Sequence, residues 1–411
     1  MTSAPTIPTP LIDLSQPPPI PAAGISRATD VLQSGWLHRY GETLGDRSEA
    51  SLLEEEFAAS VGAKYCVAVN SCGSSMFLAL VCSGVKPGDK VLMNSFTLAP
   101  VPGAIAHARA EHVFVEITPD LVIDVADLER KALQSGAKHL LLSHMRGHIC
   151  DMTAVIEIAN RLGIVVIEDC AHTMGAAWAG TPSGRFGKVG CFSLQAYKHI
   201  NAGEGGLLVT DDEDIAARAI LYSGSYMFYE QHRSRPGSEV FARWKDVTPN
   251  YSMRMSNLTA AVARPQIGLL PERARVWNDR HDRLAALLVR MPGIELPNRP
   301  QAEAYVQSSI QFQVRDLSEA GLATFLAGCR QRGVYLKWFG STEPKGYTSL
   351  SGQWGYVKNT HTPPATLTAL DRLCDMRIPL DLPREACDQI ASIIGDELNA
   401  AAALAVKSTQ S

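Results

Sequence analysis

Charge is scarce in this chain of 411 residues, and neither sign is in strong excess. Charged side chains make up 19% of the residues, below the roughly one quarter that is usual for globular proteins. With 38 basic and 42 acidic side chains, the formal net charge is −4. No overall positive field attracts a phosphate backbone, so we expect no nucleic-acid partner. The low charged fraction is typical of extensive buried surface or a large subunit interface.

Membrane-spanning and secretory patterns are also missing from the sequence. No run approaches the roughly 20 consecutive apolar residues that cross a bilayer. The N-terminal stretch has no basic region followed by an apolar core, which a secretory signal requires. The sequence therefore predicts no membrane contact and a cytoplasmic location.

Motifs for disulfides and metal ions are absent as well. The nine cysteines are odd in number and form no CxxC pair, and the 11 histidines include no HExxH. His144 and His148 are four residues apart, but Gly147 lies between them and disfavours a helix that presents both to one ion. We expect no metal site, and free thiols in a reducing compartment. The cysteines are Cys66, Cys72, Cys82, Cys150, Cys170, Cys191, Cys329, Cys374 and Cys387.

Proline is concentrated near the N-terminus, where seven prolines lie between positions 5 and 21. They disfavour a helix, so we expect residues 1–30 to form an extended arm. Residues 1–9 are expected to be disordered; beyond them, disorder and an arm lying on a neighbouring subunit both remain open. After the arm we predict a large domain over residues 31–270 and a smaller domain over 271–411.

Short apolar runs rich in β-branched residues alternate with helical patterns from about residue 52 to 210. This alternation predicts an α/β fold with a mostly parallel central sheet and helices on both faces. A smaller C-terminal α/β unit is expected to follow. The strands are predicted at Tyr65–Val69, Val91–Ser95, His112–Ile117, His139–Ser143, Ile164–Asp169, Cys191–Leu194 and Gly206–Thr210. The helices are predicted at Leu52–Val61, Ser74–Ser83, Val125–Gln134, Met152–Leu162, 212–222 and 257–290, the last interrupted by Pro265 and Pro271.

A strand gives way to a helix through small polar residues at 70–75, in the run NSCGSS. The first amide groups of such a helix lack partners within it and, with the helix dipole, can bind a phosphate. The run has neither the GK[ST] of a P-loop nor a GxGxxG spacing. An ordinary N-cap by Ser71 or Ser74 explains the same residues, so both interpretations stay open.

Two later runs carry a carboxylate and a lysine. Asp169 follows an apolar strand, at the strand end where ligands bind in open α/β sheets, and it can pair with a protonated ring nitrogen or cap a helix. Lys198 lies in a stretch otherwise without charge before the glycine-rich turn 203–206, which indicates a desolvated amine able to form a Schiff base. A phosphate site, a carboxylate for a pyridinium and a Schiff-base lysine are together what pyridoxal phosphate needs.

With these motifs in place, the sequence resembles the DegT/StrS-type sugar aminotransferases, which use pyridoxal phosphate and have the PLP-transferase fold of type I. The resemblance rests on SGWLHRYG, LEEEFAASVGAKYCVAVNS, VKPGDKVLMNSFTLAP, IEDCAHTMGA, GCFSLQAYKHINAGEGGLLVTDD and MRMSNLTAAVARPQIGLL. It covers residues from about 30 to 270 and continues weakly to the end. The cofactor-binding residues that it implies are Gly73, Ser74, Leu98, Asp169, His172, Ser193, Lys198 and Ser252, with Lys198 as the catalytic residue.

Several of these positions depart from the family pattern. Leu98 lies where an aromatic residue commonly stacks on the cofactor ring, and Ser252 where an asparagine reaches a neighbouring subunit. Arg146 replaces a common tyrosine, and it is expected to bind a carboxylate or phosphate on the substrate or to form an ion pair. We also predict substrate-binding roles for Arg254 and Lys337.

The resemblance implies a PLP-dependent aminotransferase that moves an amino group from an amino acid, glutamate or glutamine, to a keto sugar that carries a nucleotide. Because Lys198 and not a histidine occupies the lysine position, transamination is favoured over the dehydration of one branch of the family. A keto acceptor without a nucleotide, such as an aminocyclitol ketone or a free or phosphorylated sugar, remains open. So does a regulatory protein that binds the cofactor without turnover, although such a protein is expected to have lost Lys198 or Asp169. A homodimer with active sites at the subunit interface is expected.

Overall fold

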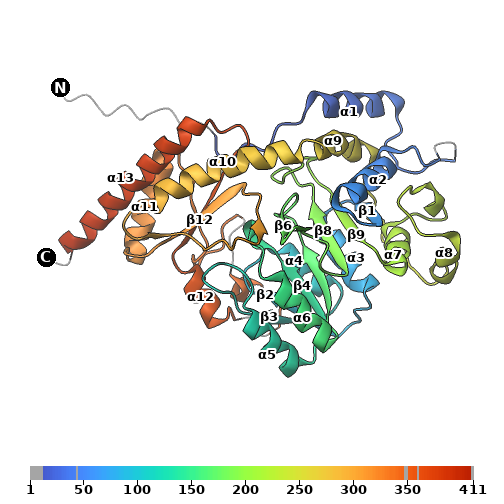
Figure 1. Ribbon diagram of the computed structural model, residues 1–411, viewed down its shortest axis with the longest axis horizontal. Helices are drawn as coiled ribbons and strands as arrows, with labels where there is room; N and C mark the ends of the chain where they lie inside the picture. Colours follow the sequence, from blue (N-terminus) through green and yellow to red (C-terminus); the bar gives the residue numbers. More distant parts are fainter. Residues whose placement is uncertain (1–12, 43–44, 347–349, 359–360, 409–411) are drawn as a thin grey trace.

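The structure is a computed structural model that describes residues 13–42, 45–346, 350–358 and 361–408, with side chains up to residue 403 (Figure 1). The disorder predicted for residues 1–9 falls outside these ranges. Within them, no helix is long and apolar enough to cross a membrane.

The larger sheet has seven strands in the order β1-β9-β8-β5-β4-β2-β3. From β8 to β3 all neighbouring strands are parallel, whereas β9 runs antiparallel to both β1 and β8. The predicted mostly parallel sheet is therefore confirmed. Its strands are β1 (Tyr65–Val69), β2 (Lys90–Asn94), β3 (Glu111–Val115), β4 (His139–Ser143), β5 (Val165–Asp169), β8 (Val189–Ser193) and β9 (Gly206–Thr210).

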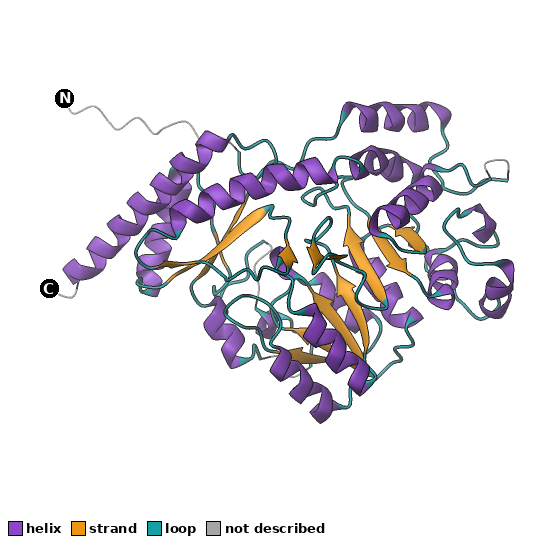
Figure 2. Ribbon diagram, in the orientation of Figure 1, coloured by secondary structure: helices purple, strands orange, loops and turns teal. Residues whose placement is uncertain are grey.

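Helices cover both faces of this sheet (Figure 2). Successive side chains of a strand point to opposite faces, and in β4 Leu140 and Leu142 enter one apolar cluster while Leu141 enters another. The Leu140 side also holds residues of α5 and α6, and the Leu141 side holds residues of α3, α4, α7 and α8. These helices are α3 (Cys72–Cys82), α4 (Pro100–His107), α5 (Val125–Ser135), α6 (Met152–Leu162), α7 (Glu213–Ser223) and α8 (Ser238–Trp244).

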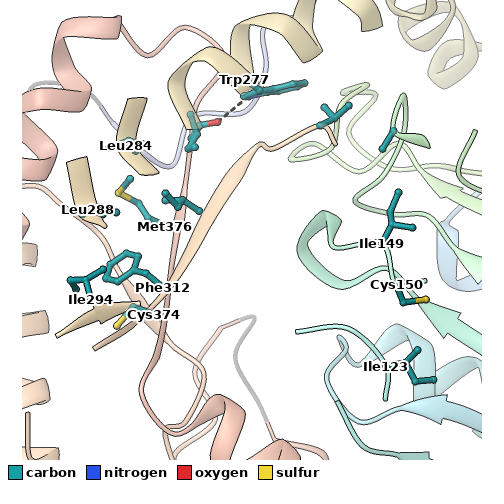
Figure 3. Packing of buried hydrophobic residues seen from close by; sticks show 14 of the residues in the cluster. Ile123, Ile149, Cys150, Trp277, Leu284, Leu288, Ile294, Phe312, Cys374 and Met376 are labelled. Carbon is teal, nitrogen blue, oxygen red and sulfur yellow. Dashed lines mark hydrogen bonds between the residues drawn. The ribbon is translucent and has the colours of Figure 1, made fainter. Parts of the chain in front are cut away.

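A second sheet lies in the C-terminal part and is antiparallel throughout, in the order β10-β12-β14-β13. Its core is continuous with one face of the larger sheet and includes Trp277 and Phe312 (Figure 3). Trp277 donates its indole N–H to the carbonyl of Ile378 at 3.0 Å, which fixes α10 against the end of β14. The elements here are β10 (Ile294–Glu295), β12 (Ser309–Val314), β13 (Lys337–Trp338), β14 (Leu373–Arg377), α10 (Leu270–Leu288), α11 (Glu319–Gln331), α12 (Pro364–Leu370) and α13 (Arg384–Ser408).

The extended arm predicted for residues 1–30 is wrong for its last part, because α1 (Ala22–Ser34) is a helix. Pro21 is its N-cap and Gly35 its C-cap, so the prolines precede the helix and do not interrupt it. The carbonyls of Pro18 and Pro19 accept hydrogen bonds from Asn201 and Arg273 of the same chain, at 2.8 and 3.0 Å. This part of the arm is therefore anchored on its own subunit.

The predicted break in the helical stretch 257–290 lies between the two prolines. Helix α9 (Asn257–Ile267) continues through Pro265, and α10 begins at Leu270 with Pro271 in its first turn, where a missing N–H costs no bond. The remaining elements are α2 (Glu49–Val61), β6 (Ala177–Trp178), β7 (Thr181–Pro182) and β11 (Glu303–Ala304), the last three forming a small sheet. The domain boundary at residue 270 stays a prediction.

Candidate active site

A cavity of about 470 Å³ lies where the carboxyl ends of β4, β5 and β8 meet the N-terminus of α3. Its other wall comes from β13 and β14 of the second sheet. Eight of the predicted site residues line it, and Ser74, Ser252 and Arg254 do not. The eight are Gly73, Leu98, Arg146, Asp169, His172, Ser193, Lys198 and Lys337.

Lys198 lies in the loop between β8 and β9, with its amine inside the cavity. The amine Nζ is 2.7 Å from Nε2 of His172. Burial, together with the positive charge of Arg146, lowers the pKa of Lys198 to about 7. Burial and the charge of Lys198 also hold the pKa of His172 well below its usual value. A neutral imidazole thus lies against an amine that is half deprotonated near neutral pH.

Asp169 ends β5 and is held in one orientation by its neighbours. Its Oδ2 accepts a hydrogen bond of 2.7 Å from the hydroxyl of Ser143, and its Oδ1 accepts one of 3.1 Å from the amide of Ala171. Thr97 in turn donates to the Ser143 hydroxyl at 2.8 Å. The carboxylate is buried yet borders the cavity, so it can meet a cationic ring nitrogen there.

The N-terminus of α3 lines another part of the cavity. Ser71 is the N-cap, since its hydroxyl accepts the amide of Ser74 at 3.0 Å. The Ser74 hydroxyl donates to Oδ1 of Asn70 at 2.7 Å, and Ser74 does not line the cavity. Ser71, Cys72 and Gly73 line it instead, as does Ser193 at the end of β8. The site offers first-turn amides of a helix and the hydroxyls of Ser71 and Ser193 to an anion.

Gly206, the first residue of β9, permits the close packing behind this helix terminus. A methyl group at this position would lie 2.3 Å from the carbonyl oxygen of Ser71 and 2.6 Å from the amide nitrogen of Cys72. The start of β9 is therefore packed directly against the anion-binding end of the cavity.

Charged residues gather where the turn after β4, which carries Arg146, meets β13 and β14 of the second sheet. Nη2 of Arg146 is 2.9 Å from Oδ2 of Asp375, and Nζ of Lys337 is 3.4 Å from the same oxygen. Arg377 lines the cavity with its guanidinium 3.8 Å from the centre of the Tyr197 ring. The ion pair expected as one alternative for Arg146 is thus present, with Asp375 as its partner.

Ser252 and Arg254 lie outside the cavity of their own chain. Ser252 is exposed and bonds to Oδ1 of Asn250 at 3.3 Å. Arg254 donates to the carbonyl of Gly224 at 3.0 Å and lies over the ring of Tyr226 at 5.4 Å. Their predicted roles at a partner's cofactor stay predictions.

The two histidines considered for a metal pair have separate partners. Nε2 of His144 is 3.2 Å from Oε2 of Glu168, and Nε2 of His148 is 2.8 Å from the amide oxygen of Gln311. All nine cysteines are buried free thiols, as the odd count and the absence of CxxC predict.

Sequence reasoning missed Ser143, Tyr197 and Arg377, which line the cavity, and Asp375, which pairs with two of its cations. Ser143 ends β4, which neighbours β5 in the sheet although their chain positions differ by about 26. Asp375 and Arg377 alternate in β14, a strand that is otherwise buried. Two charges at alternate positions of an apolar run are a signal that sequence reading can use.

A buried lysine amine, a strand-end carboxylate and a helix N-terminus around one cavity define a pyridoxal phosphate site on an open α/β sheet. The residues fit that cofactor, because the donor set supplies an amine for its aldehyde, a carboxylate for its ring nitrogen and amides for its phosphate. The fold and the site thus define the class of PLP-dependent enzymes.

Comparison with known proteins gives the family. The model of the DegT/DnrJ/EryC1/StrS aminotransferase family matches residues 20–345, and the chain belongs to this family. It is therefore a PLP-dependent aminotransferase.

Named relatives and solved structures agree with this assignment. The chain is 33% identical over 276 residues to the spore coat polysaccharide biosynthesis protein SpsC of Bacillus subtilis, covering 66% of this chain and 68% of SpsC. It is 32% identical over 254 residues to GDP-perosamine synthase of Caulobacter vibrioides, covering 60% and 65%. The fold is similar to that of the aminotransferase TlmJ from Streptoalloteichus hindustanus, with a TM-score of 0.80 at 22% identity over 94% of this chain and 98% of TlmJ.

Proposed function

We propose that this aminotransferase moves the amino group of glutamate or glutamine to the keto group of a nucleotide-linked sugar. The observation that carries the proposal is the Lys198 amine, which lies in the cavity within 2.7 Å of His172. The names of two relatives support a sugar as acceptor, since one serves polysaccharide biosynthesis and the other makes GDP-perosamine.

Three residues carry the proton chemistry in this proposal. When bound, pyridoxal phosphate supplies the electron sink that makes the Cα–H bond of an amino acid acidic. Lys198 takes the proton from Cα through Nζ, as its pKa of about 7 allows at neutral pH. Asp169, fixed by Ser143, keeps a proton on the ring nitrogen. His172 positions the Lys198 amine.

The cofactor is held at three places in this proposal. Gly73 and Ser193 bind the phosphate through an amide and a hydroxyl at the N-terminal end of α3. Ser74 supports this site by fixing the first turn of α3, because its amide donates to the Ser71 hydroxyl and its own hydroxyl donates to Asn70. Leu98 packs against the ring by dispersion alone.

The proposal includes a homodimer in which Ser252 and Arg254 lie near the partner's cavity. Large apolar side chains are exposed around them: Tyr226 is 56% exposed, Met227 62% and Tyr251 42%. Large exposed apolar side chains that gather on one surface are typical of interfaces between proteins, and these three support an interface near Arg254.

One observation favours a second acceptor class. Leu98 and Arg146 both line the cavity, and both depart from the family pattern. A carbonyl acceptor without a nucleotide, such as an aminocyclitol ketone or a free or phosphorylated sugar, is therefore the alternative.

Substitution of Lys198 tests the proposed chemistry. We expect Lys198→Ala to lose the visible absorbance band of the lysine-bound cofactor and to lower the rate with glutamate or glutamine by roughly 10³-fold. Lys86→Ala, which changes an exposed lysine, is the matched control. If the Lys198→Ala enzyme kept both the band and full turnover, the assignment would be wrong. Offering keto sugars and cyclitol ketones to the aminated enzyme then identifies the acceptor class.

A further inference from the structure

Two cations of the cavity share a single carboxylate oxygen. Arg146 and Lys337 both approach Oδ2 of Asp375, at 2.9 and 3.4 Å. The other oxygen, Oδ1, accepts a hydrogen bond of 2.7 Å from the amide nitrogen of Gln311. The single buried negative charge of Asp375 therefore faces two positive charges, and the other oxygen of its carboxylate is bonded to the neutral amide of Gln311.

Arg146 is a buried residue of the cavity wall with a strained backbone. Its backbone lies in the left-handed region at φ 56°, which is costly for a residue with a side chain. Its side chain is 7% exposed, and among the described residues neither Nε nor Nη2 makes a hydrogen bond, although Nη2 lies within ion-pair distance of Asp375. A buried guanidinium donor without a partner is expensive, so a bound group that accepts its hydrogen bond would be stabilised.

A third cation belongs to the same wall. Arg377 follows Asp375 by two residues on β14, so both side chains leave the strand on the same face. It lines the cavity together with Arg146, Lys337 and Lys198. The positive charges of Arg146 and Arg377 both lower the pKa of Lys198, which agrees with their position near the reacting amine.

We propose that Arg146, Lys337 and Arg377 form an anion subsite that binds a carboxylate or phosphate carried by the sugar or cyclitol ring of the keto acceptor. The inference rests on the proposed function, because the acceptor must occupy this cavity. A planar guanidinium and an ammonium suit both anions, and Arg146 can bind either in bidentate geometry. The subsite therefore selects a keto acid or a keto sugar phosphate over the neutral ketone.

The test uses matched ketones on the aminated holoenzyme. The panel holds 3-keto and 4-keto hexoses with a hydroxymethyl, a carboxylate or a phosphoryloxymethyl group at C5, each free and linked to UDP. The readout is the ratio of kcat/KM for the charged ketone to kcat/KM for its neutral counterpart. This ratio cancels effects on the chemistry that both ketones share. The two charged series distinguish carboxylate from phosphate.

We expect the wild type to prefer the charged ketone by roughly ten- to a hundredfold in kcat/KM, because hydrogen bonds between charged groups stabilise binding by that factor. Arg146→Gln and Lys337→Gln should each lower this ratio at least about threefold, and Arg146→Lys should restore part of it. Lys86→Gln, at the surface, should leave it unchanged. Lys337 is partly exposed, so its variant keeps the test available if Arg146→Gln fails to fold.

Three results would overturn the inference. The first is a wild type that shows no preference for the charged ketones. The second is an unchanged kcat/KM ratio in Arg146→Gln and Lys337→Gln. The third is a loss, in these variants, of only the half-reaction with glutamate or glutamine. The last result would assign the cations to the donor's carboxylate. A wild type that accepts no ketone of the panel but is aminated by glutamate or glutamine would instead contradict the proposed acceptor, and the inference with it.

Discussion

Lys198 has a pKa of about 7 because burial and the charge of Arg146 both disfavour its ammonium form. The amine must be neutral to attack the aldehyde of the cofactor. We therefore expect the rate at which apoenzyme takes up pyridoxal phosphate to rise with pH through a midpoint near 7, far below the ordinary lysine value of 10.5. Stopped-flow absorbance at several pH values measures this midpoint.

Arg146→Gln gives the control for this pH profile. Removing a positive charge near Lys198 raises its pKa, so the midpoint should move to higher pH and uptake at neutral pH should slow. An unchanged midpoint would show that Arg146 does not act on the amine.

The residues of the site were predictable where their chemistry is encoded in one continuous run. Asp169, His172 and Lys198 belong to such runs, and the structure brings all three to one cavity. Ser143 and Asp375 were not predictable in this way. Their contacts depend on which strands become neighbours, and a serine or an aspartate in a strand does not say what it will face.

At the scale of secondary structure, the packing of β9 against the start of α3 gives a sharp prediction. Gly206→Ala would place a methyl group 2.3 Å from the carbonyl oxygen of Ser71 and so displace the anion-binding amides. We expect pyridoxal phosphate to bind at least about tenfold more weakly, because the loss of one charge-assisted hydrogen bond weakens binding by that factor. Titration of apoenzyme followed by absorbance measures it.

Gly268→Ala is the control, since a methyl group there meets no atom within 4 Å and the backbone is not left-handed. Wild-type cofactor affinity in Gly206→Ala would contradict the steric coupling.

Helix α2 is fixed to β1 by a buried ionic network. Glu54 accepts two hydrogen bonds from Arg39, at 2.7 and 2.8 Å, and one from the amide of Ala68 at 2.8 Å. Because Glu54→Gln leaves the Arg39 charge buried and unpaired, we expect the free energy of unfolding to fall by about 3 kcal/mol. Urea denaturation at neutral pH measures the loss, with Glu55→Gln on the exposed side of α2 as the control.

The same network predicts a pH dependence of stability. Burial alone would raise the pKa of Glu54, but the Arg39 guanidinium outweighs it and lowers the value from 4.5 to about 2. The folded state therefore holds this proton more weakly than the unfolded state. The stabilisation is complete above pH 4.5 and is lost as the pH falls toward 2, a trend that Glu54→Gln should flatten.

Strands and helices were predicted best where apolar periodicity is strong. The seven strands of the larger sheet lie within about two residues of their predicted ranges. The helix α1 was missed because the prolines before it dominate the composition of that stretch, although none lies inside it. The two-residue strands β6, β7 and β11 are too short for a periodic pattern to identify.

For the whole molecule, the central question is its assembly. If the exposed apolar side chains near Arg254 form the dimer interface, Met227→Asp should shift sedimentation from dimer toward monomer by placing a charge there. Val289→Asp, an equally exposed apolar position at the end of α10, should leave the dimer intact. A Met227→Asp protein that stays fully dimeric would place the interface elsewhere.

The division of the cavity wall between two sheets has a consequence for how such an enzyme changes in evolution. Lys198, Asp169 and the N-terminus of α3 lie at the ends of strands of the first sheet or in their connections, whereas Lys337 and Arg377 come from the second sheet and Arg146 from the turn after β4. Two of the three cations proposed to recognise the acceptor, Lys337 and Arg377, thus lie on a part of the chain that carries none of the proposed proton-transfer residues. During evolution, substitutions in β13 and β14 can change which acceptor binds while the proton-transfer residues remain the same.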